Sequence, residues 1–225
     1  MNRRDYELIE AYMLTCMRDS AHDKEHIYRV LNVALEIAEG ETAVNYDVLI
    51  AACLLHDIAR QEQYDNSNID HAEFGAQKAY DFLTKNGFAT EFSQHVADCI
   101  KTHRFRGSNI PRSIEAKILF DADKIDATGT LGIARTLFYN GIVGEPLYSL
   151  DSERNVLDGS NDTESSFFQE YKFKLENVYS KIITDTGRCI AESRRRSAVD
   201  FYNSMLAEVS ESYKIGKSLL KKHID

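Results

Sequence analysis

The sequence has few residues that interrupt helices. Its 225 residues include only two prolines, Pro111 and Pro146, together with 11 glycines and no tryptophan. Proline removes a backbone donor and, with glycine, supplies most tight turns, so this scarcity permits long helices and disfavours a fold of many short strands. We therefore expect an all-α fold.

Cysteines and apolar runs are also scarce. The four cysteines form no CxxC pair, which argues against a zinc ribbon or a disulfide framework and fits reduced thiols in a cytoplasm. The longest apolar run, Val48 to Leu55, is far shorter than the roughly 20 residues of a membrane span. No apolar segment follows the basic N-terminal residues, as a secretory signal would require. We expect a cytoplasmic protein without a membrane partner.

Basic residues are outnumbered by acidic ones. The chain has 27 Lys and Arg against 36 Asp and Glu, which gives a formal charge of -9. Because a nucleic-acid backbone is neutralised by a net basic face, this charge argues against a nucleic-acid polymer as partner. A small anionic substrate would need local positive charge.

Helical periodicity covers most of the chain. We expect helices at about residues 5–17, from 20 to Gly40, at 47–60, 71–86, 91–103, from 114 to about 140 with a break at Gly129, and at 164–180 and 184–208; loops are expected at 61–70, 104–112 and 144–160. With 43% hydrophobic residues, the chain is long enough for one sizeable core. We predict a single domain over residues 1–225, with its core at about 20–140, closing helices at about 164–208 and a charged tail that frays from Ser210.

One apolar helix ends in the polar pair His56-Asp57. Both side chains need polar partners in a packed interior, and a shared cation supplies one. Imidazole and carboxylate ligands together favour manganese, iron, cobalt, nickel or zinc, whereas an all-oxygen site suits magnesium or calcium. Since adjacent helix residues point about 100° apart, further ligands must come from neighbouring helices. His26 and Asp123 are the candidates.

These four residues occur in the order found in the HD superfamily of metal-dependent phosphohydrolases, which the sequence resembles. The similar blocks lie within about residues 20–208 and are His22-Asp-x-x-His26-Ile-x-Arg-Val30, Leu54-Leu-His-Asp57, Glu115-Ala-Lys-Ile-Leu-Phe-Asp-Ala-Asp-Lys-Ile-Asp-Ala127, Leu131-Gly-Ile-Ala-Arg-Thr136 and Thr186-Gly-Arg-Cys-Ile-Ala-Glu-Ser-Arg194. The resemblance implies an all-helical HD-domain bundle with a divalent ion between its central helices, magnesium being a further candidate. It also implies hydrolysis of a phosphoester or phosphoanhydride. Some relatives act as nucleotide pyrophosphohydrolases, so a nucleotide is the expected substrate.

The resemblance also suggests roles for single residues. Asp57 would bind the ion and accept a hydrogen bond from the attacking water. His71 and His103 lie in the order seen in HD members that hold two metals, so the count of ions, one or two, stays open. Otherwise both histidines would contact the substrate phosphate or transfer a proton.

Cationic side chains near these ligands are the candidates for binding phosphate. Lys124, which directly follows Asp123, is the first, and Arg135, Arg104 and Arg60 follow because guanidinium can hold phosphate through two hydrogen bonds. Asp126 lies one turn after Asp123, so it is expected to orient a ligand histidine or Lys124.

Two other functions compete with hydrolysis. One is a di-iron HD-fold oxygenase, which would need both His71 and His103 as ligands, and the other is a ligand-binding protein without turnover. An aromatic series between residues 167 and 179 is expected in the core or in a homodimer interface, and comprises Phe167, Phe168, Tyr171, Phe173 and Tyr179.

Overall fold

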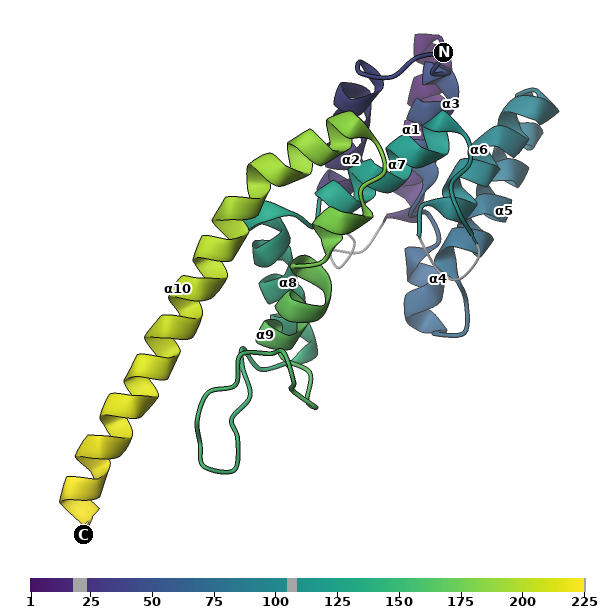
Figure 1. The fold of residues 1–225 in the computed structure, drawn as a ribbon. Helices are drawn as coiled ribbons and strands as arrows, with labels where there is room; N and C mark the ends of the chain where they lie inside the picture. Colours follow the sequence, from purple (N-terminus) through teal and green to yellow (C-terminus); the bar gives the residue numbers. More distant parts are fainter. Residues whose placement is uncertain (18–23, 105–108, 225) are drawn as a thin grey trace. The chain divides into compact units, whose positions relative to one another are not determined.

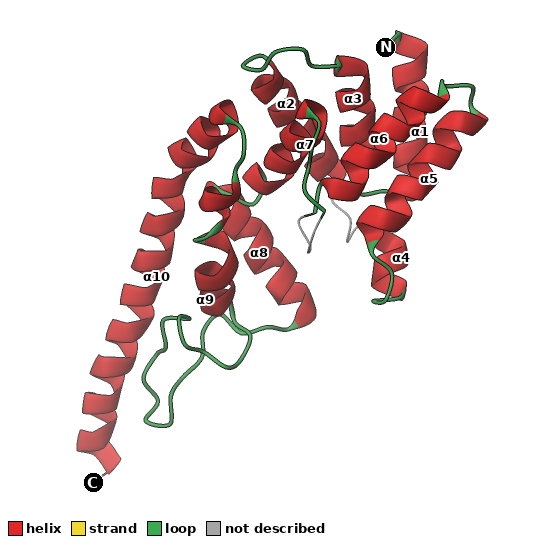
Figure 2. Cartoon of the chain, turned by 45° about the vertical axis from the view of Figure 1, so that its right-hand side comes forward, coloured by secondary structure: helices red, strands yellow, loops and turns green. Residues whose placement is uncertain are grey.

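The computed structural model describes residues 1–17, 24–104 and 109–224. In these ranges every regular element is helical (Figures 1 and 2), and the chain forms one isolated bridge, between Leu150 and Val156. The all-α prediction is thus confirmed. The helices are α1 (Arg3–Cys16), α2 (Lys24–Ala38), α3 (Tyr46–Leu55), α4 (Arg60–Asp65), α5 (His71–Lys85), α6 (Thr90–Thr102), α7 (Ile114–Ile125), α8 (Gly129–Val143), α9 (Phe167–Glu170) and α10 (Asp185–Ile224), with a π-helix at Tyr171–Leu175 and a 3-10 helix at Val178–Lys181.

The chain divides into two compact units. The first comprises Met1–Asp126 and Ile183–Gly187, and the second comprises Ala127–Ile182 and Arg188–Asp225. A single domain over the whole chain remains a prediction. The predicted start of the second helix, at residue 20, lies outside the described residues, as does His22 of the first similar block.

Helix α3 is the centre of the first unit. Its side chains are apolar on nearly every side and seven of its ten residues are buried, because α1, α2, α6 and α7 all pack against it. Asn45 caps its start by accepting hydrogen bonds from the amides of Asp47 and Val48, both at 3.2 Å. The helix ends at Leu55, earlier than the predicted Arg60. His56 and Asp57 therefore emerge at its buried carboxyl end.

Helix α4 occupies part of the segment that was predicted to be a loop. It carries no buried residue, so the apolar periodicity that marks other helices is missing from it. The ammonium group of Lys78 on α5 donates to the carbonyl of Ile58, at 3.0 Å, and to the carboxylate of Glu62. These contacts hold the start of α4 against α5, and they place Arg60 and Gln63 beside the histidines described below.

Helix α7 is fixed by a segment from far along the chain. Its Asp121 carboxylate is fully buried and accepts hydrogen bonds from the amide of Ile183 at 2.8 Å and from the amide and hydroxyl of Thr184 at 2.6 and 2.7 Å. These three bonds satisfy a buried charge that would otherwise be costly. They join Ile183–Gly187 to the first unit.

The second unit has its own aromatic core. Tyr171 stacks on Tyr202, with ring centroids 4.1 Å apart, and the cluster is completed by buried residues including Phe167 and Phe168. Of the five aromatic residues expected in a core or an interface, four are buried, whereas Phe173 is 62% exposed. The helix predicted at 164–180 is interrupted, because one turn of α9 leads into the π-helix and then the 3-10 helix.

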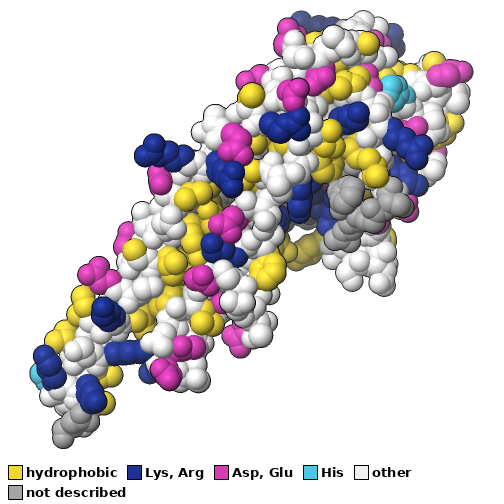
Figure 3. All heavy atoms as spheres, in the orientation of Figure 1, with side chains coloured by type: hydrophobic (Ala, Val, Ile, Leu, Met, Phe, Trp, Pro, Cys, Tyr) yellow, Lys and Arg dark blue, Asp and Glu magenta, His cyan; other side chains and the backbone are white. Residues whose placement is uncertain are grey.

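Helix α10 is longer than predicted. It continues to Ile224, where an end near Glu208 and a frayed tail were expected. Within the second unit, the ammonium group of Lys217 donates to the carbonyl of Glu153, at 2.6 Å, and to the side chain of Asn155, at 2.8 Å. Basic and acidic side chains are mixed along its visible face (Figure 3). No helix in the described ranges is long and apolar enough to cross a membrane.

Candidate metal centre

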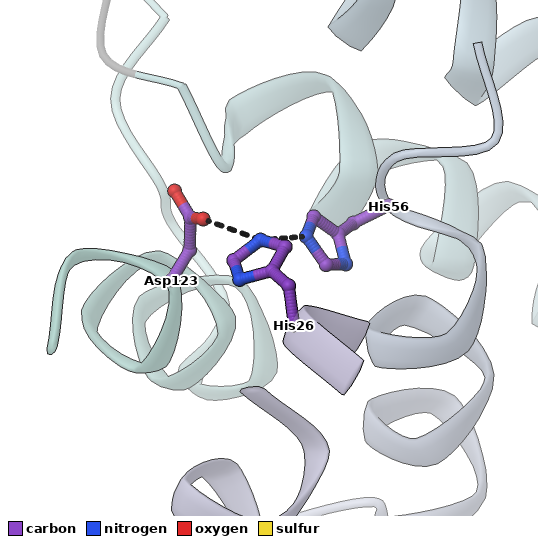
Figure 4. Close-up of side chains that lie close together, drawn as sticks. All are labelled: His26, His56 and Asp123. Carbon is purple, nitrogen blue, oxygen red and sulfur yellow. Dashed lines mark hydrogen bonds and ion pairs between the residues drawn. The ribbon is translucent and has the colours of Figure 1, made fainter. Parts of the chain in front are cut away.

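Three of the predicted ligands meet at one point of the first unit. His26 lies in the first turn of α2, His56 follows α3, and Asp123 lies on α7. The Nε2 atom of His26 is 3.4 Å from the Nε2 atom of His56 and 3.4 Å from Asp123 Oδ1 (Figure 4). Their potential ligand atoms all lie within 4.8 Å of one another. We call these three residues the first group.

A second group of potential ligands comprises Asp57, His71 and His103, all buried. His71 begins α5 and His103 follows α6, as predicted. Their Nε2 atoms are 3.3 Å apart and lie 3.3 and 3.6 Å from Asp57 Oδ1.

The Asp57 carboxylate lies between the two groups. While Oδ1 faces the second group, Oδ2 is 3.7 Å from the Nε2 atoms of both His26 and His56. The four predicted ligands His26, His56, Asp57 and Asp123 are therefore brought together, and Asp57 connects them to His71 and His103.

Backbone carbonyls fix the orientation of two imidazoles. His56 Nδ1 is 2.8 Å from the carbonyl oxygen of Cys53, and His103 Nδ1 is 2.6 Å from that of Ile100. A carbonyl can only accept, so Nδ1 carries the hydrogen in both rings. The Nδ1 bond thus turns the Nε2 atom of each ring toward the centre, as in a histidine that ligates a metal.

A carboxylate performs the same task for His26. Its Nδ1 donates to Asp126 Oδ2 at 2.7 Å, while Arg29 Nε donates to the other oxygen, also at 2.7 Å. Asp126 was predicted to orient a ligand histidine or Lys124, and it contacts His26 directly. Arg29 was not singled out, although it lies within the first similar block.

The electrostatics of the first group favour a cation. Burial lowers the pKa of His26, but hydrogen bonds with Asp123 and Asp126 outweigh it and raise this pKa to about 9. Burial lowers the pKa of His56 to about 4, so its ring is neutral at pH 7. Although burial would raise the pKa of Asp123, Lys124 and His26 hold it well below its usual range. A divalent ion would replace the proton that this group attracts.

Lys124 and Arg60 contact acidic residues of the centre. Lys124 Nζ is 2.9 Å from Asp123 Oδ2 and lies 4.8 Å above the Phe120 ring centroid. Arg60 Nε donates to Asp57 Oδ1 at 2.9 Å. Burial would raise the pKa of Asp57, but Arg60 and the surrounding imidazoles hold it well below its usual range.

Arg104 contacts the outer side of the second group. Its NH1 atom is 3.0 Å from His71 Nδ1 and 3.2 Å from the side-chain oxygen of Gln63. Gln63 also lies against His71 Nδ1, yet its sequence neighbourhood carries no pattern that would have identified it. Arg135 lies on α8 in the second unit, and its role in binding substrate remains a prediction.

Replacing Asp126 with asparagine is expected to weaken Mn²⁺ binding about 10- to 100-fold, the usual cost of losing a group that orients a metal ligand. The amide keeps the shape but loses the charge that pairs with His26 and Arg29. Isothermal titration with Mn²⁺ measures the change. The matched control is Asp98→Asn, at an exposed position on α6, and equal affinity in both variants would contradict the role of Asp126.

The comparisons with known proteins agree with this geometry. The HD domain family matches residues 24–128, which include both groups. YpgQ of Bacillus subtilis strain 168 is 30% identical over 209 residues, covering 90% of this chain and 93% of YpgQ. The chain belongs to the HD superfamily of hydrolases.

Two solved structures are similar to this chain in fold, and one further relative is similar in sequence. A predicted HD-superfamily hydrolase from an uncultured Thermotogales bacterium has a TM-score of 0.61 and 31% identity, covering 89% of this chain and 90% of the other. YpgQ crystallised with ADP has a TM-score of 0.68 and 26% identity, over 89% and 97% of the two chains. A dihydroneopterin 2',3'-cyclic phosphate phosphodiesterase of Methanocaldococcus jannaschii is 31% identical over 119 residues, 46% of this chain and 45% of that enzyme.

Proposed function

We propose that this HD-superfamily chain is a metal-dependent phosphohydrolase that cleaves a phosphoester or phosphoanhydride bond of a small molecule, with a nucleotide as substrate. The observation that carries the proposal is the meeting of His26, His56, Asp57 and Asp123, the first three of them buried, with the Nε2 atoms of His26 and His56 3.4 Å apart. Two relatives support the substrate class, since YpgQ was crystallised with ADP and the Methanocaldococcus enzyme acts on a cyclic phosphate.

The donor set fits a divalent ion. Two imidazole nitrogens and two carboxylates are typical ligands of manganese, iron, cobalt, nickel or zinc, and they suit magnesium less well. When bound, such an ion lowers the pKa of a water molecule and polarises a phosphoryl oxygen. His26, His56, Asp57 and Asp123 would hold it.

The protein's own residues supply the remaining tasks. The Asp57 carboxylate, held ionised in a buried position, can accept a hydrogen bond from the attacking water and orient it. Lys124 places an ammonium group beside Asp123, where it can contact a phosphate oxygen. His71 and His103, buried on the other side of Asp57, would contact the phosphate or move a proton to the leaving group.

A substrate screen tests the proposal. The full chain, supplied in turn with Mn²⁺, Fe²⁺, Co²⁺, Ni²⁺, Zn²⁺ and Mg²⁺, is incubated with nucleoside mono-, di- and triphosphates, cyclic nucleotides and sugar phosphates. We expect turnover on at least one nucleotide, loss of that turnover with EDTA, and recovery when the ion is restored. Release of inorganic phosphate identifies a nucleotidase, and release of pyrophosphate identifies a pyrophosphohydrolase. Tight nucleotide binding without turnover under every ion would contradict hydrolysis and favour a ligand-binding protein.

A further inference from the structure

The second group has the composition of a second metal site. Asp57, His71 and His103 are all buried and their ligand atoms lie within 4.8 Å of one another. In a site with two ions, the Asp57 carboxylate would bind one ion through each oxygen. What decides whether this happens is the set of charges around Asp57 Oδ1.

Arg60 already occupies that oxygen. Its Nε atom donates to Asp57 Oδ1 at 2.9 Å, and this is the oxygen that faces His71 and His103. The guanidinium group is always charged, so an ion bound by the second group would lie beside a fixed positive charge. Because the Asp57 side chain is only 6% exposed, little water screens the repulsion.

Arg104 adds a second cation on the outer side of His71. Its NH1 atom, which can only donate, is 3.0 Å from His71 Nδ1. When Nδ1 accepts this bond, the hydrogen of the neutral ring lies on Nε2, which then cannot ligate an ion but can donate to Asp57 Oδ1. The Gln63 oxygen also faces Nδ1 and favours the opposite tautomer, yet the charge of Arg104 opposes a nearby cation in either case.

The first group differs from the second in which carboxylate oxygens contact a cationic side chain. Lys124 contacts Asp123 through Oδ2, whereas Oδ1 is the atom that faces His26. The inner oxygen of Asp123 thus has no contact with the ammonium group. Likewise, Arg60 donates to Asp57 Oδ1 and the oxygen that faces the first group is Oδ2. The carboxylate oxygens that face the first group are therefore not the ones that Arg60 and Lys124 contact, whereas Asp57 Oδ1, the carboxylate oxygen of the second group, is shared with Arg60.

We propose that Arg60 and Arg104 stand in for a second metal ion, so that the chain binds one ion, at the first group with Asp57, and the second group binds none. This inference rests on the proposed metal-dependent function. It predicts that the arginines, and not a lack of ligands, set the ion count.

The test is the stoichiometry of Mn²⁺ binding in the full chain. Wild type, Arg60→Gln, Arg60→Lys and Arg104→Gln are stripped with EDTA and titrated with Mn²⁺ by isothermal calorimetry, with metal content checked by mass spectrometry and folding by circular dichroism. We expect one ion in wild type and in Arg60→Lys, which keeps the charge. Arg60→Gln should bind a second ion, at least about tenfold more tightly than any weak second binding in wild type. Arg104→Gln should change in the same direction.

Each other outcome overturns the inference. Two ions in wild type would show that the arginines exclude nothing and would admit the di-iron oxygenase. One ion in both glutamine variants would show that their charges do not set the count. If Arg60→Gln does not fold, the Arg104→Gln result decides. No bound ion in wild type would overturn the proposed function as well, so the two failures are distinguishable.

Discussion

Asp57→Ala is expected to abolish turnover, with a loss of at least about a thousandfold, and to remove the bound ion while the helical fold survives. The Asp57 carboxylate faces both groups of ligands, at 3.3 to 3.7 Å from four imidazole Nε2 atoms. A ligand of this kind contributes mainly to the ion, because the side chain lies beyond the end of α3 and outside its apolar packing. Arg60, which loses its partner, has a side chain that is 34% exposed and can turn to water.

Three measurements check this result: Mn²⁺ content after gel filtration, the thermal unfolding curve by circular dichroism, and hydrolysis of the best substrate from the screen. Asp98→Ala, an exposed aspartate on α6, is the control for loss of a carboxylate. A variant that keeps stoichiometric Mn²⁺ and more than about a tenth of the turnover would refute the assignment of Asp57.

Asp121→Ala should lower the free energy of unfolding of the first unit by about 3–5 kcal/mol, more than any other substitution considered for this protein. The carboxylate is fully buried and accepts three hydrogen bonds from Ile183 and Thr184, at 2.6 to 2.8 Å. Without it, two amides and a hydroxyl lose their acceptor in a place with little water. Asp121 differs in this from Asp123, two residues later, whose carboxylate faces the ligand histidines.

Urea unfolding followed by circular dichroism measures the change. Thr184→Val keeps the amide bonds to Asp121 but removes the hydroxyl, which donates to Asp121 and accepts from the amide of Gly187 at 3.2 Å. It should cost about 1–2 kcal/mol, which makes it the graded control. The three hydrogen bonds of the Asp121 carboxylate come from Ile183 and Thr184, which belong to neither ligand group, so the folded fraction of Asp121→Ala should bind Mn²⁺ normally. A loss below about 1 kcal/mol would contradict the anchoring role of this aspartate.

The sequence predicted the helices whose boundaries have local causes. The starts of α3 and α7 have such a cause, since Asn45 and Ser113 cap them, and the predicted starts at 47 and 114 lie within one residue of the observed ones. Helix α4 was not predicted because none of its residues is buried, so the sequence shows no apolar periodicity there. What holds its start is the contact of Lys78 on α5 with Ile58 and Glu62. The C-terminal extension of α10 was missed for a similar reason, since Lys217 finds its partners more than sixty residues away.

The ligands were predictable in identity and order but not in grouping. His26, His56 and Asp123 meet as expected, and the residue types alone indicate a metal. Asp57 directs one oxygen to each group because of the turn after α3 and the positions of α5 and α6. The spacing of residues along the sequence does not give these positions. Gln63 acts through contacts across the fold, so a single sequence could not assign it, whereas Arg29 belongs to the first similar block and only its contact with Asp126 needed the structure.

Helix α7 also has a consequence for how the protein is made. All six histidines and aspartates of the two groups have left the ribosome once residue 123 has emerged. The amides of Ile183 and Thr184, which donate to Asp121, follow about sixty residues later. Until then the Asp121 carboxylate lacks the three hydrogen bonds that it accepts from these two residues. A nascent chain, or any truncated version that stops near residue 128, thus has all six candidate ligands but lacks the bonds that join Ile183–Gly187 to α7. We therefore expect the proposed ion to bind late, after the chain has been made well beyond its candidate ligands.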